Sequence, residues 1–414
     1  MCFRAYNPDT DLEAVRRIWR ETGWIEGKDE HKAVMDLLLE CCRGSVAEIA
    51  GEAECLVLTG PGTIRYLDEA LPFSCVAGVT TSRIARKMGF AGQLTARAIA
   101  DDVAEGALVS GLGMFEQGYY DRLGFGSGGY VDRISFDPAD LKVPRPSRPP
   151  KRLLEKDYEA VHACRLARQP HHGQCSFTSP QIPRADILWE AEKNFGLGWF
   201  DGPHGELTHQ VWFRVRGEME TGPYSVFYLD WQNKDQFLEL MGLIRNLDDQ
   251  VRMVTIRESH GIQFQDLLGK PFRFRTITKG SEFDARPWIG AYWQMRMNDI
   301  PGCLAKTHLP NVETVRFNLE VTDPIATLLP NDAPWRGVAG VYKVVLGPES
   351  SAIKGTDKTL PTLRASVNAF TRMWLGIRSA TALTFTDDLD APPELLTTLD
   401  RILRLPDPQP DWDF

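Results

Sequence analysis

A strand-to-helix junction with one central glycine is the feature that most constrains the fold of this chain. Residues 73–81 have the pattern of a strand, and they lead through Arg86-Lys87-Met88-Gly89-Phe90-Ala91 into a helical stretch that ends near residue 105. Small residues at such a junction let a backbone approach a pyrophosphate, and the first N–H groups of the helix point at its oxygens. Basic side chains at Arg86 and Lys87 add charge that suits phosphate. The pattern predicts a phosphate-bearing cofactor, although a plain basic turn with a helpful glycine has the same sequence.

A second motif follows farther along, at Tyr120-Asp121-Arg122-Leu123-Gly124-Phe125. It resembles the Y-x-[KR]-x-G-F signature that closes the cofactor site of the GCN5-related N-acetyltransferases. The resemblance implies that the hydroxyl of Tyr120 lies near the sulfur of coenzyme A and protonates the departing thiolate. A phenol with an ordinary pKa of about 10 is protonated at neutral pH and can donate that proton. The two motifs occur in the order found in that family.

Competing motifs find less support. Residues 124–129 satisfy G-x-G-x-x-G, but a dinucleotide fingerprint must open a helix, whereas this one runs into the strand-like residues 130–136. The histidines and cysteines between 162 and 175 lack the spacing of a zinc site, so we expect no metal. There is no G-x-S-x-G elbow of a serine hydrolase.

The bulk composition sets wider limits. A chain of 414 residues is expected to form about three domains, since domains average about 150 residues. No apolar run approaches the roughly 18–20 residues that span a bilayer, and the first residues lack the apolar core of a signal peptide. The eight cysteines are scattered without a C-x-x-C pair, which is typical of reduced thiols in a cytoplasmic protein. The net charge of −9 argues against nucleic-acid binding.

Element order and composition divide the chain into segments. Helix and strand patterns alternate in the first segment, so we expect a mixed α/β domain over residues 1–140. Residues 143–150 are rich in proline and basic side chains, which predicts an extended linker within 141–152. A second α/β segment covers 153–286, without a cofactor loop after a strand. A third, smaller α/β domain covers 287–414.

The whole chain resembles the Eis (enhanced intracellular survival) family. Residues 79–89 align without gaps with the family's strand and pyrophosphate loop, residues 115–126 match the stretch around its tyrosine, and residues 293–301 are similar to the opening strand of its last domain. The resemblance implies tandem acetyltransferase-like domains, the second degenerate, followed by a sterol-carrier-like domain. It also implies acetyl-CoA as the cofactor and a homohexamer.

The same resemblance assigns residues to the site. Cofactor contacts are expected from Val79, Thr80, Thr81, Arg86, Lys87, Gly89, Phe90 and Ala91. The family's terminal carboxylate acts as a general base, and this chain also ends in an aromatic residue, Phe414. An anchoring role for that tail is the alternative, and it is compatible with the first.

The acceptor is less constrained than the cofactor. Trp24, Asp29 and Asp413 are candidates for an acidic, partly aromatic pocket, although residues 21–27 do not match the family's acceptor pattern. The expected partner is a primary amine, either a polyamine-like or aminoglycoside-like small molecule or a lysine side chain. The alternative function is a lipid or hydrophobic-ligand carrier that retains a vestigial acetyltransferase domain. The intact loop and Tyr120 favour the enzyme.

Overall fold

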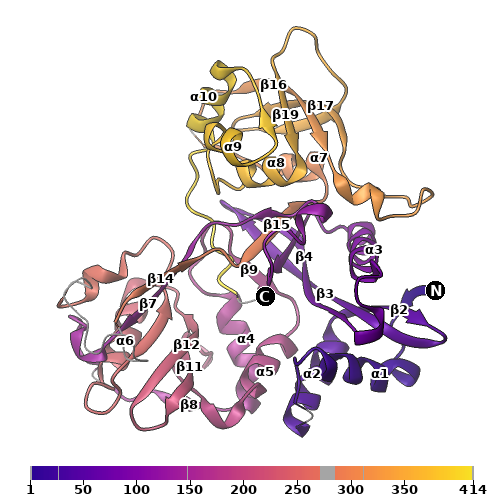
Figure 1. Cartoon of the computed structure of the whole chain (residues 1–414). Helices are drawn as coiled ribbons and strands as arrows, with labels where there is room; N and C mark the ends of the chain where they lie inside the picture. The colour runs from indigo at the N-terminus through magenta and orange to yellow at the C-terminus, as the bar shows by residue number, and fades with distance from the viewer. Residues whose placement is uncertain (1, 27, 147, 271–284, 311, 413–414) are drawn as a thin grey trace. The chain divides into compact units, whose positions relative to one another are not determined.

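The computed structural model describes residues 2–26, 28–146, 148–270, 285–310 and 312–412, and it separates into two compact units (Figure 1). Described residues within Met1–Gly129, His171–Ser179 and Ala291–Phe414 form the first unit. Those within Tyr130–Pro170 and Pro180–Gly290 form the second. Each unit therefore combines segments that are distant in the sequence.

The first unit is built on an eight-stranded mixed sheet. Its strands in spatial order are β1 (Cys2–Ala5), β2 (Arg43–Ile49), β3 (Glu52–Tyr66), β4 (Glu69–Thr81), β5 (Val109–Gly113), β15 (Trp293–Met297) and β6 (Gly126–Ser127), with β9 (Cys175–Phe177) pairing with β3. The helices of this part are α1 (Pro8–Glu21), α2 (Asp29–Cys41) and α3 (Phe90–Ala104). β4 and β5 are parallel and are joined by α3, which packs against β3 and β4.

Local sequence accounts for these helices. The side chain of Asn7 caps α1 by accepting the N–H of Asp9, and Pro8 suits the first helical position. Val15, Ile18 and Trp19 then recur at helical spacing and are buried. α3 buries Phe90, Leu94 and other apolar residues in a core that also includes Tyr120.

The second unit repeats the arrangement of the first. Its seven-stranded sheet has the order β8 (Lys151–Leu153), β10 (Asn194–Trp199), β11 (His209–Glu218), β12 (Gly222–Asp230), β13 (Val254–Arg257), β7 (Val131–Phe136) and β14 (Pro287–Gly290). Its helices are α4 (Tyr158–Leu166), α5 (Gln181–Leu188) and α6 (Lys234–Arg245). β12 and β13 are parallel and are joined by α6, as β4 and β5 are by α3.

Each of the two sheets contains one strand that follows, in the chain, directly after a strand of the other sheet. In the first unit β15 lies between β5 and β6, although the chain reaches β15 directly after β14 of the second sheet. In the second unit β7 lies between β13 and β14, although the chain reaches β7 directly after β6 of the first sheet. The compact units divide the chain between Gly129 and Tyr130 and between Gly290 and Ala291, whereas the sequence suggested domain boundaries at 140 and 287. Alternation along a strand identifies its buried face, but not the sheet in which it pairs.

The proline-rich stretch, which the sequence predicts as a linker, contacts the second unit at its first residues. Val143 is only 3% exposed and belongs to the apolar core of the second unit. A Cβ at Gly242 of α6 would lie 2.3 Å from the carbonyl oxygen of Pro144, so the helix and the segment are in close contact. The segment is thus part of the second unit, into which it leads as β8.

The C-terminal part of the first unit has its own five-stranded sheet. The spatial order is β18 (Ser351–Lys354), β17 (Gly340–Leu346), β16 (Val315–Thr322), β19 (Thr362–Ser366) and β20 (Leu389–Asp390). Its helices are α7 (Ile300–Ala305), α8 (Val367–Trp374), α9 (Ala380–Thr386) and α10 (Pro393–Ile402). α8 contacts β16 and β19 of this sheet and also β15 and β6 of the larger one (Figure 1). It therefore connects the two sheets of the first unit.

A buried carboxylate in α3 makes stability depend on pH. Asp102 accepts hydrogen bonds from the hydroxyls of Ser74 and Thr59 and from Arg43, the last two at 3.1 Å. Burial nevertheless raises the pKa of Asp102 to about 6. The pKa of Asp102 is higher in the folded protein than in the unfolded chain. The contribution of the protonated Asp102 carboxyl to the free energy of unfolding is therefore complete at low pH and is lost as pH rises through about 6.

The side chain in Asp102→Asn is neutral at every pH. We therefore expect the free energy of unfolding of this variant, relative to that of the wild type at the same pH, to rise by about 1 kcal/mol from pH 5 to pH 7.5. Urea unfolding of both proteins at the two pH values measures this difference. Asp101→Asn, at the exposed neighbouring position of α3, is the control and should show no such change. An equal pH dependence in the two variants would contradict the prediction.

Candidate active site

β4 separates from β5 at the point where the site is expected. The parallel register joins Phe73 to Val109 and ends where Val76 faces Leu112, but β4 continues to Thr81. The pairing of β4 with β3 has an irregularity at this position, because Leu58 pairs with Gly78 and Thr59 with Val76. One edge of β4 is consequently left without β5 over its last residues.

The free edge of β4 presents backbone donors. The N–H of Ser82 donates to the carbonyl oxygen of Glu54 across the β3 side, and the register pairs Thr81 with Cys55. Since backbone groups alternate along an antiparallel strand, the N–H groups of Val79 and Thr81 face the opposite side, which β5 has left. Val79 and Thr81 are partly buried, whereas Thr80 between them is buried.

The loop after β4 leaves the start of α3 uncapped. A short 3-10 helix, Arg83–Ala85, leads into Lys87 and Gly89, which have φ angles of 64° and 82°. Gly89 adopts this left-handed conformation at no steric cost, whereas a residue such as Lys87 pays about 1 kcal/mol or more. Gly89 is the N-cap of α3 and offers no side-chain cap, so the N–H groups of Phe90 and Ala91 have no capping acceptor. Phe90 is buried, while Arg86 and Lys87 are exposed.

Tyr120 lies in the same apolar core as Phe90 and is 3% exposed. Its ring meets Tyr119 edge to face at 4.8 Å, with Phe115 and Phe125 also near its edges. Burial raises the pKa of the Tyr120 hydroxyl above its ordinary value. Within the described part of the chain this hydroxyl forms no hydrogen bond, so it is a protonated donor without a protein acceptor.

Arg122, the basic residue of the tyrosine motif, connects the two motifs, although the sequence gave it no role in the site. A Cβ at Gly92, in the first turn of α3, would lie 3.9 Å from the Nη2 atom of Arg122. Its guanidinium stacks on the ring of Tyr119 at 4.3 Å. The helix start therefore has a third basic side chain beside Arg86 and Lys87. The motif spacing gave no sign that Arg122 reaches α3.

The C-terminal tail is anchored to residues near the end of β5. The N–H of Cys175 donates to the carbonyl of Pro410 at 2.8 Å. The ring of Trp412, 5% exposed, meets Phe177 edge to face at 4.6 Å, and its carbonyl accepts the hydroxyl of Tyr292 at 2.9 Å. The carbonyl of Tyr292 in turn accepts the N–H of Met114, the residue after β5. Asp413 and Phe414 lie outside the described residues.

The two acceptor candidates near the first helices are on the surface. Trp24 is 43% exposed, and its ring tilts against Trp19 at 5.6 Å. Asp29 begins α2, where its exposed carboxylate pairs with Lys32 at 2.9 Å and has a lowered pKa because of that contact. The same region is tied to the cofactor loop by Glu21, which accepts the N–H of Arg83 at 2.8 Å. That link between α1 and the loop was not predicted.

The second unit has the same strand–helix–strand order, but its helix begins with a side-chain N-cap. The side chain of Asn233 caps α6 by accepting the N–H of Gln236 at 3.1 Å. The N–H of Gln232 is also occupied, by the side-chain oxygen of Gln236. Asn233 thus satisfies one backbone donor in the first turn of α6, whereas Gly89 offers no side chain to do so in α3.

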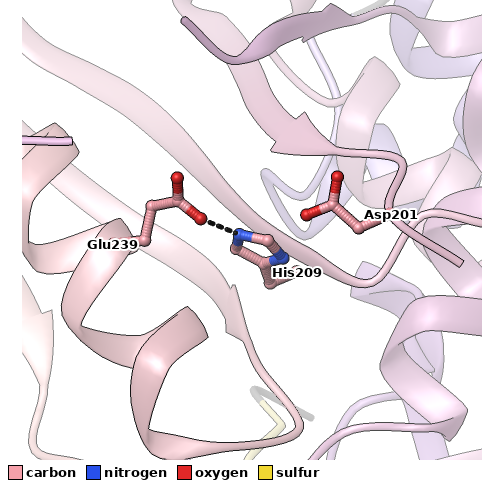
Figure 2. A group of neighbouring side chains, drawn as sticks. All are labelled: Asp201, His209 and Glu239. Atoms are coloured by element: carbon pink, nitrogen blue, oxygen red, sulfur yellow. Dashed lines mark hydrogen bonds and ion pairs between the residues drawn. The ribbon is translucent and has the colours of Figure 1, made fainter. Parts of the chain in front are cut away.

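A side-chain cluster of the second unit has the composition of a metal site. The possible ligand atoms of Asp201, His209 and Glu239 lie within 4.8 Å of one another (Figure 2). Arg148 already donates to both oxygens of Asp201, at 2.8 and 2.5 Å, and to both of Glu239, at 2.8 Å each. His209 bonds Glu239 at 3.0 Å, and burial lowers its pKa. The guanidinium supplies the positive charge here, so the cluster is explained without a metal ion.

Comparisons with solved structures give the fold its class. The chain is similar over its whole length to Eis1 from Mycobacterium abscessus, with 18% identity, full coverage of both chains and a TM-score of 0.75. A GCN5-related N-acetyltransferase from Anabaena variabilis ATCC 29413 gives 16%, full coverage of both and 0.76. A protein from Enterococcus faecalis V583 described as a probable N-acyltransferase gives 17%, with 98% of this chain and 96% of that one covered, and 0.78.

These likenesses confirm the predicted fold class, the tandem acetyltransferase fold of the Eis type. The family model of the sterol carrier protein domain matches residues 300–410, which confirms the predicted C-terminal domain. No curated protein matches the sequence. Among the described residues, no helix is long and apolar enough to cross a membrane.

Proposed function

We propose that this chain is an acetyl-CoA-dependent N-acetyltransferase that acts on a primary amine. The observation that carries the proposal is the free edge of β4 beside the uncapped start of α3, with Tyr120 buried in the core that both share. Acyl transfer from coenzyme A needs backbone N–H donors for the carbonyls of an extended chain, a place for pyrophosphate and a proton donor near sulfur. This region offers all three.

The residues present fit the cofactor. The N–H groups of Val79 and Thr81 suit the amide carbonyls of pantetheine and the thioester carbonyl. The start of α3, from Gly89 to Ala91, suits pyrophosphate because its donors are free and the helix dipole favours negative charge. Arg86, Lys87 and Arg122 suit phosphate oxygens. Thr80, also a candidate for a cofactor contact, lies buried between Val79 and Thr81. Acetyl-CoA, when bound, supplies an activated acetyl thioester.

Proton movement completes the mechanism. The amine acceptor is mostly protonated at neutral pH and must lose a proton before it can attack. We assign this base to the terminal carboxylate of Phe414, because the tail is anchored at Trp412 beside Tyr292 and the end of β5. Tyr120 holds its proton because burial raises its pKa, and it donates that proton to the leaving sulfur.

Several classes of amine acceptor fit this mechanism. Polyamine-like and aminoglycoside-like amines and lysine side chains all satisfy the chemistry, and Trp24, Asp29 and Asp413 are our candidates for contacts with them. We also propose a cytoplasmic homohexamer, which the resemblance of the sequence to the Eis family implies. The sterol carrier match over 300–410 supports the competing function of a hydrophobic-ligand carrier.

Titration of the full chain with acetyl-CoA in a calorimeter separates the two functions. We expect saturable binding, and release of free thiol when a panel of amines is added. Gly89→Val should weaken cofactor binding by about 10-fold or more, because a β-branched residue cannot easily keep the left-handed conformation of the loop. Gly106→Val is the matched control, since Gly106 has a φ of 99° at the other end of α3. No binding of acetyl-CoA by the wild type at millimolar concentration would overturn the enzyme and favour the carrier.

A further inference from the structure

The turn that carries Tyr120 is held by a residue of the C-terminal domain. Asn368 lies in the first turn of α8, where Ser366 already caps the helix by accepting the N–H of Ala369. The side-chain nitrogen of Asn368 donates to the carbonyl of Asp121 at 3.0 Å and to the carbonyl of Phe125 at 2.7 Å. The first carbonyl belongs to the first residue of the short helix Asp121–Leu123, and the second lies two residues after its end.

Close packing strengthens this contact. A Cβ at Gly124 would lie 2.7 Å from Cγ1 of Val367, and one at Gly126 would lie 2.5 Å from the carbonyl oxygen of Asn368. Any other residue at either position would push α8 away. The glycines of the motif are therefore needed for the approach of the C-terminal domain, besides any role at the cofactor.

A buried ion pair holds the same turn from a second side. Arg296 of β15 and Asp323 are both fully buried and pair at 2.8 Å. Arg296 also donates to the carbonyl of Leu123, inside the turn. Asp323 accepts the N–H groups of Val338 at 2.9 Å and Ile325 at 3.2 Å, so its charge is well compensated. The turn is thus fixed by contacts at three of its carbonyls.

Tyr120 depends on this turn for its position. Its hydroxyl has no hydrogen bond to any described residue, and only ring contacts and the backbone orient it. Its carbonyl accepts the N–H groups of Leu123 at 2.9 Å and Phe125 at 3.3 Å, so the backbone of the turn and the tyrosine move together. A shift of the turn would therefore move the hydroxyl relative to the reacting sulfur.

We propose that Asn368 is a positioning residue that sets the hydroxyl of Tyr120 for proton transfer, and that the sterol-carrier-like domain thereby controls turnover. The inference rests on the proposed acetyltransferase function. It gives the C-terminal domain a catalytic purpose that does not require it to bind a lipid. We call Asn368 a positioning residue because both hydrogen bonds that its side-chain nitrogen donates go to backbone carbonyls.

Steady-state kinetics of the full-length protein test this role. Asn368→Ala should lower kcat by about 10-fold with KM for acetyl-CoA nearly unchanged, since a misplaced donor slows the chemistry and spares binding. Asn368→Asp should be worse, because its carboxylate would face two carbonyl oxygens. Asn318→Ala is the matched control. Asn318 also donates to two carbonyls, those of Asp357 and Leu360 at 2.8 and 3.2 Å, but within the C-terminal domain.

The double variant with Tyr120→Phe decides how Asn368 acts. If it works through the hydroxyl, Asn368→Ala should cost little further kcat once that hydroxyl is gone. An additive loss, an unchanged kcat in Asn368→Ala, or an equal loss in Asn318→Ala would each overturn the inference while leaving acetyl transfer intact. Failure of the proposed function would show itself differently, as absence of acetyl-CoA binding or thiol release in the wild type.

Discussion

Tyr120→Phe should lower kcat by about 10²-fold or more, because it removes the only hydroxyl that we assign as proton donor to the leaving sulfur. The fold should be unaffected. The ring stays in its contacts with Tyr119 and Phe125, and no described residue loses a hydrogen bond. The usual ambiguity between lost chemistry and lost structure is therefore small at this position.

The measurement is kcat and KM for acetyl-CoA, together with the thermal midpoint of unfolding. Tyr119→Phe removes the adjacent phenol and is the matched control, with kcat expected within about 2-fold of the wild type. Because burial raises the pKa of Tyr120, wild-type kcat should show no fall from its ionisation up to about pH 10. Unchanged turnover in Tyr120→Phe would remove the proton-donor role.

Local features of the fold and site were predictable from the sequence. Strand, loop and helix around Gly89 follow from alternation, from a glycine that permits the left-handed conformation and from helical periodicity. The structure has β4 ending at Thr81 and α3 beginning at Phe90, as the pattern indicated. Tyr120 was identified through a short motif, and it lies in the apolar core that also includes residues of α3, while its role in the site stays a prediction.

Features that depend on distant pairing were not predictable. Residues 131–136 and 293–297 both have strand patterns, but nothing in either segment indicates that they exchange sheets. Asn368 contacts backbone carbonyls far away in the chain, and a carbonyl has no sequence signature. The approach of Arg122 to Gly92 likewise has none. The prolines at 143–150 looked like a linker because their packing partner, Gly242, lies in a helix about a hundred residues later.

Blocking the terminal carboxylate should abolish turnover and spare the cofactor. A chain whose last residue is Phe414 carboxamide, made by ligation of a synthetic tail, differs from the wild type only in losing the charge that we assign as base. We expect kcat to fall by about 10²-fold or more at neutral pH, with the dissociation constant of acetyl-CoA unchanged. A C-terminal tag should have the same effect, whereas the same tag at the N-terminus should not.

The described part of the tail explains why so small a change should matter. Pro410 and Trp412 are fixed by Cys175, Phe177 and Tyr292. Trp412→Ala should lower kcat as well, since it releases the anchor while keeping the carboxylate. Asp413→Asn is the decisive companion. If it inactivates the enzyme and the Phe414 carboxamide does not, the base is the side chain of Asp413 and the terminal carboxylate is only an anchor.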